Sequence, residues 1–288
     1  MEHHEATRTA DLDVPAEPRM IGTSLGPVAL WGEADGPAIV LLHANGGSNR
    51  DWDAVAPRLG EVLPVLRVDW PGFGASPAPR LDRFDGAMSY AAALDQVLDA
   101  LAADGVTRTV LIGNSVGGRA ALQAARARPD RVVAVVGVAP GGFTSPNPAT
   151  RGFCRLMASD RLGRRMIVPL TRLYLRRRTE VTRAEIVRAR EVASDPVASA
   201  VHAAVWASFA DARHDLRADG PSPVPTLLTW GRWDPVLPAR TDGRRAARVL
   251  GAPLHTFATG HEPFAERPDE WLDVVVPFLR SVLPAGEA

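Results

Sequence analysis

A serine between closely spaced glycines is the first feature of this chain that could perform chemistry. The segment Gly113-Asn114-Ser115-Val116-Gly117 follows the apolar run 109–113 and precedes a helical pattern over residues 119–128. A Gly-x-Ser-x-Gly motif between a strand and a helix is typical of a tight turn that exposes the serine hydroxyl. Backbone N–H groups at the helix N-terminus favour developing negative charge there. The pattern predicts that Ser115 is a nucleophile, and the alternative is a serine that only caps the helix.

The acid of such a site is expected after Ser115, at the end of a later strand. A serine hydroxyl needs a base to accept its proton, and the base needs an acid to orient it. With this motif the order along the chain is serine, acid, histidine. Asp234 follows the apolar run 226–230, whereas the loop after the preceding strand, residues 139–150, contains neither Asp nor Glu. Asp234 is therefore the predicted acid, and the alternative is an aspartate that only forms the turn before Pro235.

Two of the seven histidines follow Asp234 and are candidates for the base. His255 lies inside the apolar run 252–258 and is expected in a strand. His261 follows that run on a loop, which is where the base should lie. The sequence therefore predicts His261 as the general base, and the alternative is an ordinary loop histidine.

An acyl-transfer intermediate carries an oxyanion that needs preorganised N–H donors. Val116, directly after the nucleophile, is expected to supply one donor. The second is expected from the segment His43-Ala44-Asn45-Gly46-Gly47-Ser48, which follows an early apolar run. The N–H of Asn45 is the predicted donor, and that of Ala44 is the alternative. His43 precedes the serine and is expected to brace this loop through hydrogen bonds.

Residues beside these positions are expected to contact the substrate. Asn114 adjoins the nucleophile, and Trp233 adjoins the acid. Apolar residues at helical spacing more often pack in a core. Five apolar residues of the later helical region could nevertheless line a pocket: Phe153, Leu156, Met157, Trp206 and Phe209. The predicted substrate contacts are His43, Asn114, Trp206, Phe209 and Trp233.

Apolar runs and helical patterns alternate along most of the chain. The alternation predicts an α/β fold, a mostly parallel twisted sheet with helices on both faces. A hairpin is expected over residues 22–33. Further strands are expected at residues 38–42, 62–68, 109–113, 132–138, 226–230 and 253–257. Helices are expected near residues 88–103, 119–128, 241–249 and 269–282.

Residues 141–222 interrupt this alternation between two core strands. The segment lacks strand-like runs and is too long for a plain connection, so it is expected to form a helical cap over Ser115. The chain then divides into a disordered tail (1–19), a core (20–140 and 223–288) and the cap.

The expected cap is rich in arginine. A solvated helix surface is the simplest interpretation. The alternative is that one arginine reaches inward to pair with a substrate carboxylate. The arginines considered are Arg161, Arg164, Arg165, Arg172, Arg176, Arg177 and Arg178.

These segments together resemble the α/β-hydrolase superfamily, from about Met20 to the C-terminus. The oxyanion segment is similar to the family's His-Gly-x-Gly loop, with Ala44 in place of a glycine. The other similar segments are the elbow around Ser115, the turn at residues 69–76, the acid loop at residues 231–234 with Pro238, and the histidine loop at residues 260–263 with Glu266, Pro268 and Trp271. The resemblance implies the α/β-hydrolase fold with a helical cap.

The resemblance also narrows the chemistry. Haloalkane dehalogenases and epoxide hydrolases use aspartate as the nucleophile, so Ser115 argues against both. Asn114 makes the elbow similar to that of hydrolases that cleave carbon–carbon bonds in ring-fission products. The leading expectation is a serine hydrolase of a small, largely apolar carboxylic ester. The alternatives are a hydrolase of a carbon–carbon bond in a β-diketone or ring-fission product, and a ligand receptor or non-hydrolytic biosynthetic catalyst on the same fold.

Composition is consistent with one globular enzyme. The formal net charge of the 288 residues is zero, so nothing indicates a nucleic-acid partner. The single cysteine, Cys154, excludes an intrachain disulfide. No apolar run approaches ~20 residues and residues 1–19 lack a secretory core, so no membrane association and a cytoplasmic location are expected. The expected partner is a small-molecule substrate, without metal or organic cofactor, and the chain is expected to be a monomer or a homodimer.

Overall fold

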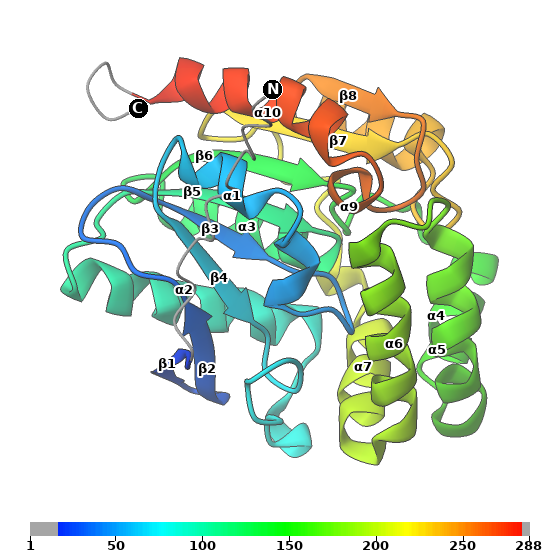
Figure 1. The fold of residues 1–288 in the computed structure, drawn as a ribbon. Helices are drawn as coiled ribbons and strands as arrows, with labels where there is room; N and C mark the ends of the chain where they lie inside the picture. Colours follow the sequence, from blue (N-terminus) through cyan, green and yellow to red (C-terminus); the bar gives the residue numbers. More distant parts are fainter. Residues whose placement is uncertain (1–16, 284–288) are drawn as a thin grey trace, which may run out of the picture.

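The computed structural model describes residues 17–283 and has an eight-stranded sheet with helices on both faces (Figure 1). The strands run in the order β1-β2-β4-β3-β5-β6-β7-β8. β2 pairs antiparallel with β1 and β4, and all other neighbours are parallel. The strands are β1 (Arg19–Thr23), β2 (Gly26–Trp31), β3 (Ala38–Leu42), β4 (Val65–Asp69), β5 (Thr109–Asn114), β6 (Val132–Val138), β7 (Thr226–Gly231) and β8 (Leu254–Phe257). This architecture confirms the predicted α/β-hydrolase fold with its initial hairpin.

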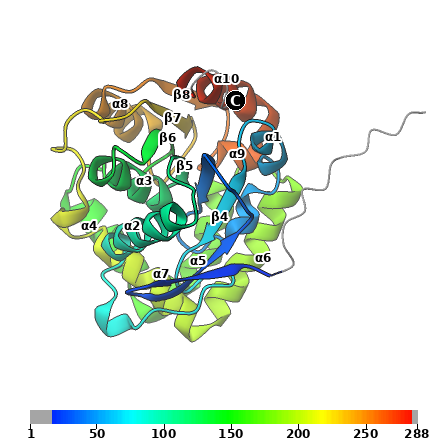
Figure 2. The same ribbon diagram turned by 90° about the vertical axis from the view of Figure 1, so that its left-hand side faces the viewer.

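The helices of the core cover the two faces of the sheet (Figures 1 and 2). α2, α3 and α8 pack on one face, and α1 and α10 pack on the other. The core helices are α1 (Ala56–Gly60), α2 (Ala87–Ala103), α3 (Val116–Ala127), α8 (Arg244–Leu250), α9 (Pro263–Glu266) and α10 (Pro268–Val282). Among the helices of residues 17–283, none is both long and apolar enough to cross a membrane.

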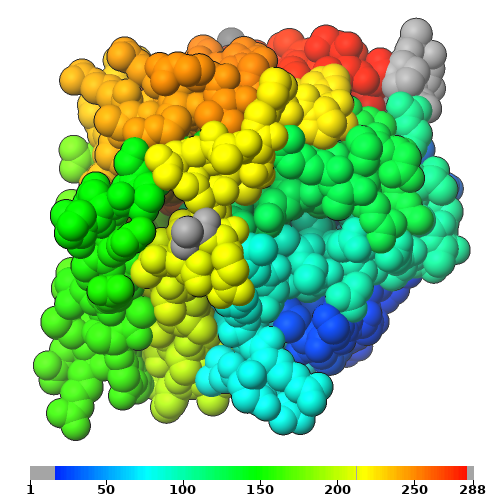
Figure 3. Space-filling view, turned by 180° about the vertical axis from the view of Figure 1, so that it is seen from behind, coloured from blue at the N-terminus to red at the C-terminus, as the bar shows by residue number. Residues whose placement is uncertain are grey.

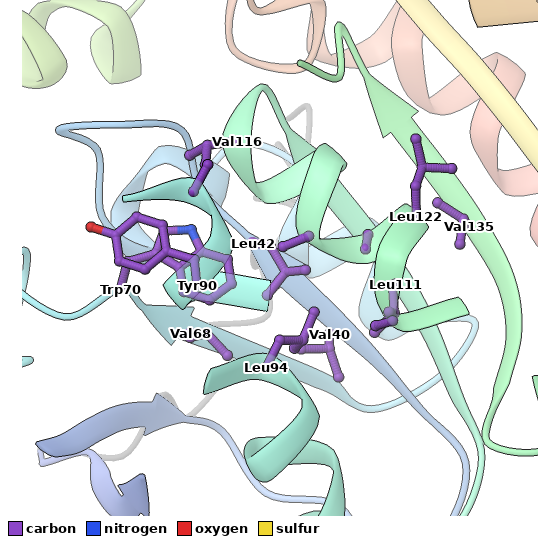
Figure 4. Close-up of a cluster of buried hydrophobic side chains, with 14 of the residues drawn as sticks. Val40, Leu42, Val68, Trp70, Tyr90, Leu94, Leu111, Val116, Leu122 and Val135 are labelled. Atoms are coloured by element: carbon purple, nitrogen blue, oxygen red, sulfur yellow. The ribbon is translucent and has the colours of Figure 1, made fainter. Parts of the chain in front are cut away.

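Strand β3 shows why the central strands are apolar at every position. Its residues alternate between the two faces, with Val40 and Leu42 in the core under α2 and α3, and Ile39 and Leu41 in the core under α1 and α10. Figure 4 shows Val40 and Leu42 beside Leu94 of α2. A parallel strand buried on both faces cannot carry an alternating polar pattern.

Element boundaries depart from the sequence expectation in a few places. β4 begins at Val65 rather than at residue 62, because the N–H of Val62 donates to the carbonyl oxygen of Leu59 in the turn that ends α1. α3 begins at Val116, earlier than expected, because the tight turn leads directly into the helix. β1 begins at Arg19, which the expected tail included, and residues 1–16 lie outside the described part of the chain.

A helical insertion connects β6 to β7. Its helices are α4 (Pro148–Met157), α5 (Asp160–Tyr174), α6 (Glu180–Ser194) and α7 (Pro196–Ser208). Each begins after a residue whose side chain accepts a backbone N–H of the first turn, which defines the start of the helix. These capping residues are Asn147, Ser159, Thr179 and Asp195. The insertion forms a bundle at one end of the sheet, and its green-to-yellow surface lies below the orange C-terminal part in Figure 3.

Candidate active site

Ser115 joins the end of β5 to the start of α3 in a strained conformation, with φ 53° and ψ −112°. Two close backbone approaches accompany this turn. A methyl group at Gly113 would lie 2.4 Å from the backbone of Gly117, and one at Gly117 would lie 2.4 Å from the carbonyl oxygen of Leu42. The packing of β3, β5 and α3 therefore explains why glycines stand on both sides of Ser115.

Asp234 and His261 meet through the loops that follow β7 and β8. His261 Nδ1 lies 2.5 Å from Asp234 Oδ2, and both side chains are buried. Asp234 Oδ1 accepts the backbone N–H groups of Val236 and Leu237 at 2.8 and 2.9 Å, which orients the carboxylate. The backbone N–H of His261 donates to the carbonyl oxygen of Tyr174 at 3.0 Å. With Nδ1 directed at Asp234, Nε2 is the nitrogen left to accept a proton.

Ser115 and His261 line one cavity beneath the helical insertion. No hydrogen bond joins their side chains in this structure. Catalytic hydrogen bonds are often long before a substrate binds, so the separation does not argue against a functional pair. The cavity is closed on the insertion side by Leu170 and Tyr174 of α5 and by Trp206 of α7.

The expected oxyanion donors lie beside Ser115. Val116 is the first residue of α3, so its N–H has no acceptor within the helix. Ala44 and Asn45 line the cavity with Ser115, and their N–H groups find no acceptor within residues 17–283. Asn45 Nδ2 donates to the carbonyl oxygen of His202 in α7 at 3.1 Å, which ties this loop to the insertion. Asn45 remains the predicted donor and Ala44 the alternative.

A wide cleft leads outward from Ser115 between the insertion and the loop after β7. The volume of this cleft is about 540 Å³. Phe153, Trp206 and Phe209 line it, and the Trp206 ring packs edge-on against Phe153 with centroids 5.4 Å apart. Trp206 and Phe209 thus lie where a substrate would contact them.

Three other predicted substrate contacts do not line the cavity or the cleft. His43 is fully buried, with Nδ1 2.6 Å from the carbonyl oxygen of Ala44 and Nε2 accepting the N–H of Trp70 at 2.9 Å. The His43 ring thus ties the loop after β3 to the segment after β4. The amide of Asn114 is buried and donates to the carbonyl oxygen of Val138 at 3.1 Å. Trp233 is 47% exposed and lies on the outer surface of its loop.

Two glycines allow the acid loop and the histidine loop to approach each other. A methyl group at Gly231 would lie 1.4 Å from the carbonyl oxygen of Gly260, and one at Gly260 would lie 1.8 Å from the carbonyl oxygen of Tyr174. The Asp234–His261 contact therefore depends on backbone approaches that admit no side chain.

Gly231→Ala is expected to displace the histidine loop. Because the added methyl group meets backbone rather than a flexible side chain, we expect the free energy of unfolding to fall by about 2 kcal/mol. A shift of the imidazole by about 1 Å should lower kcat/KM by about 10²-fold. Urea denaturation and ester kinetics measure the two effects. Gly152→Ala on the exposed face of α4, where a methyl group meets nothing within 4 Å, is the matched control and should lose neither. Equal behaviour of the two variants would contradict the prediction.

Comparison with known proteins decides the family. A sequence model described as "Alpha/beta hydrolase family" matches residues 39–274. This chain belongs to the alpha/beta hydrolase family. It is 28% identical over 267 residues to the 2-hydroxy-6-oxo-6-phenylhexa-2,4-dienoate hydrolase of Comamonas testosteroni, covering 85% of this chain and 88% of that protein.

Solved structures agree with the fold of this alpha/beta hydrolase. The 2-hydroxy-6-oxo-6-phenylhexa-2,4-dienoate hydrolase from Rhodococcus superposes with a TM-score of 0.77 at 23% identity, covering 93% of this chain and 99% of that one. A thermophilic esterase from Thermogutta terrifontis superposes with a TM-score of 0.73 at 21% identity, with the same two coverages. At these identities the likeness concerns the fold alone.

Sequence reasoning missed how this alpha/beta hydrolase anchors its histidine loop. Glu266 Oε1 accepts the N–H of Gly260 at 2.9 Å, and Oε2 accepts the N–H groups of Arg176 and Arg177 at 3.1 and 2.9 Å. One buried carboxylate thus holds the histidine loop against the link between α5 and α6. Glu266 stands in the segment that resembles the family's histidine loop, but nothing local in the sequence shows its partners.

An arginine of the insertion does reach inward, and it is none of the seven considered from the sequence. Arg188 of α6 pairs with the buried carboxylate of Asp51, in the short 3₁₀ helix η1 (Asn49–Trp52). Because Asp51 already neutralises its charge, Arg188 is not available to pair with a substrate carboxylate, which was the alternative role considered for a cap arginine. A helix-face pattern could not identify it, because its partner lies 137 residues earlier.

The protonation of His261 follows from its surroundings. Burial lowers its pKa, but the charge and hydrogen bond of Asp234, with further contributions from Glu262 and Glu266, outweigh burial and raise the pKa above the ordinary 6.5. A general base must be neutral to accept a proton, so the form of His261 that could serve as a base accumulates as pH rises through this pKa.

We therefore expect kcat/KM to rise with pH and to reach half of its plateau above pH 6.5. Initial rates across about pH 5 to 9, with the ring of His261 titrated in parallel by NMR, measure both quantities. A midpoint below 6.5, or a rate midpoint that differs from the titration of His261, would argue against this base.

Proposed function

We propose that this alpha/beta hydrolase is a cofactor-free serine hydrolase that cleaves a carboxylic ester with an apolar acyl group through an acyl-enzyme. The observation that carries the proposal is the convergence of Ser115 and His261 on one cavity, with Asp234 directly behind the imidazole. A strained serine, an oriented imidazole and unpaired backbone N–H groups are the parts that acyl transfer requires.

The mechanism follows from these positions. His261 Nε2 accepts the proton of Ser115 as Oγ attacks the ester carbonyl, and Asp234 stabilises the imidazolium that forms. The N–H groups of Val116 and Asn45 hold the oxyanion. The leaving alcohol takes the proton from His261, and the acyl group stays on Ser115. A water molecule, deprotonated by His261, then releases the carboxylic acid and restores the free serine.

The wide cleft supports an apolar acyl group. Its walls near Ser115 are aromatic, with Phe153, Trp206 and Phe209 around the opening. Burying an apolar acyl chain against such rings contributes roughly 25 cal/mol per Å². The cleft is therefore suited to hold the acyl half of a substrate while its carbonyl lies at Ser115.

Carbon–carbon bond cleavage is the second candidate. It is supported by the 28% identity, over most of both chains, to a hydrolase named for a dienoate substrate. The same serine, acid and histidine would act on a ketone carbonyl, and the leaving group would be a stabilised carbanion rather than an alcohol.

A screen of p-nitrophenyl esters of increasing acyl length beside several vinylogous diketones separates the candidates. Wild type and Ser115→Ala are compared, and reaction of Ser115 with a fluorophosphonate is followed by mass spectrometry. Ester turnover that depends on Ser115 supports the proposal, and diketone cleavage without ester turnover supports the second candidate. Saturable binding of these compounds with no turnover and no labelling would overturn both.

A further inference from the structure

A narrow polar recess adjoins the cavity that Ser115 and His261 line. The two spaces share walls formed by the loop after β3 and by α5 and α7. The volume of the recess is about 20 Å³, enough for one hydroxyl group, so the rest of a leaving group would lie in the adjoining cavity. The charged residues of this polar recess are Asp51, Glu185, Arg188 and Glu262, and its other polar residues include Asn45 and His202.

The polar recess contains no cation free to bind an anion. Among the described residues that line it, Arg188 is the only arginine, and its guanidinium is paired with Asp51 Oδ1. Asp51 is buried and its other oxygen accepts the N–H of Ser48 at 3.1 Å. His202, also on the wall, is neutral because burial lowers its pKa to about 4.

The remaining charges in the polar recess are carboxyl groups. Burial and, to a smaller extent, the charge of Asp51 raise the pKa of Glu262 to about 7. Burial also raises the pKa of Glu185 well above its ordinary value. The recess is therefore neutral or negative at neutral pH, and an entering carboxylate would meet buried carboxyl groups without a counter-ion.

Four buried polar atoms of residues that line the polar recess have no hydrogen-bond partner, and they include both an amide oxygen that accepts and a guanidinium N–H that donates. They are Asn45 Oδ1, Glu185 Oε1, Arg188 Nε and Glu262 Oε2. A hydroxyl group donates one hydrogen bond and accepts others, so it can serve both kinds of atom. A carboxylate only accepts, so it would leave Asn45 Oδ1 without a donor.

The position of His261 decides which part of the substrate reaches the polar recess. The histidine gives its proton to the leaving atom, so the leaving group lies on the side of His261. His261 lines the cavity that adjoins the recess and does not line the wide cleft. The acyl group therefore occupies the cleft, and the leaving group points into the recess.

We propose that the polar recess selects esters whose leaving alcohol carries a further neutral hydroxyl group, and that it rejects leaving groups that carry a carboxylate. This inference rests on the proposed ester hydrolysis and names the class of its leaving group. The pairing of Asp51 with Arg188 is the element that excludes anions, because it occupies the guanidinium.

Three esters of hexanoic acid test the proposal at pH 7.5: the 2-hydroxyethyl, ethyl and carboxymethyl esters. Each kcat/KM is divided by the rate constant for alkaline hydrolysis, which removes differences in intrinsic reactivity. We expect the normalised kcat/KM of the hydroxyethyl ester to exceed that of the ethyl ester by at least about fivefold. It should exceed that of the carboxymethyl ester by at least about tenfold. The proposal would be overturned if the normalised kcat/KM of either the carboxymethyl or the ethyl ester equalled that of the hydroxyethyl ester.

Asp51→Asn tests the excluding element directly. The substitution leaves Arg188 unpaired, so the normalised ratio of carboxymethyl to hydroxyethyl turnover should rise by at least about tenfold. The double variant Asp51→Asn with Arg188→Gln should lose that gain, which a merely structural defect would not do. Asp53→Asn removes the same charge outside the recess, beside Arg50 and Arg67, and should leave the ratio unchanged.

The outcomes separate this inference from the proposed function. If wild type cleaves none of the three esters, the esterase proposal fails and the inference with it. If it cleaves them and the ratio does not respond to Asp51→Asn, only the inference fails. Should Asp51→Asn not fold, as judged by circular dichroism, the wild-type order of the three esters decides alone.

Discussion

Ser115→Ala is expected to lower kcat by at least about 10³-fold while the protein remains folded. The proposed nucleophilic oxygen is lost, so no acyl-enzyme should form, whereas the cleft proposed to bind the acyl group is unchanged. Alanine keeps the β-carbon, so the strain at φ 53° is the same in the variant as in wild type. Stopped-flow and steady-state hydrolysis of a p-nitrophenyl ester measure the loss, and circular dichroism and thermal melting measure the fold.

Ser281→Ala provides the control for Ser115→Ala. Its hydroxyl lies on the exposed surface of α10, where it donates to the carbonyl oxygen of Phe278. This variant should keep wild-type kcat and should still be labelled at Ser115 by a fluorophosphonate. A folded Ser115→Ala protein that retains most of the esterase activity would rule out Ser115 as the nucleophile.

His261→Ala is expected to lower kcat by a similar factor, about 10³-fold or more, and to remove the rise of kcat/KM with pH near neutrality. The serine then has no base to accept its proton and the leaving alcohol has no acid. Because Asp234 is left without its 2.5 Å partner in a buried site, we also expect a lower free energy of unfolding. Rates across the pH range and denaturant titration measure both effects.

His255→Ala is the matched control for the histidine. His255 is exposed on the edge strand β8 and its ring lies 4.7 Å from that of Phe257, away from the cavity. The rate and the pH profile should stay those of wild type. A large loss of rate in His255→Ala with a small loss in His261→Ala would show that the base is the other histidine.

The strands and the turn at Ser115 could be predicted because their signals are local. Continuous apolar runs such as residues 132–138 match β6 at both ends, since a parallel strand buried on both faces must be apolar throughout. Within the Gly-x-Ser-x-Gly motif, Gly113 reports a backbone approach to Gly117 four residues later, although Gly117 itself also meets Leu42 of β3. The order of Ser115, Asp234 and His261 then follows from which strands end where.

Substrate contacts were harder to predict because they depend on side-chain direction. Phe209 and Trp233 are both aromatic residues near the expected site, yet the first lines the cleft and the second faces outward. Nothing in the neighbouring residues distinguishes them. Only the packing of the insertion against the core shows which aromatic ring reaches the substrate.

The sequence by itself determined the alternating strands and helices, the helical insertion and the three residues proposed for catalysis, because periodicity and turn chemistry act between close neighbours. The α/β-hydrolase fold followed from the resemblance of these motifs to the superfamily. Tertiary structure alone decided that Gly231 meets Gly260, and that Arg188 forms an ion pair with Asp51, 137 residues away. Such contacts form between segments that meet only after the chain has folded. The charge of the polar recess, and with it the proposed choice of leaving group, is therefore a property of the fold.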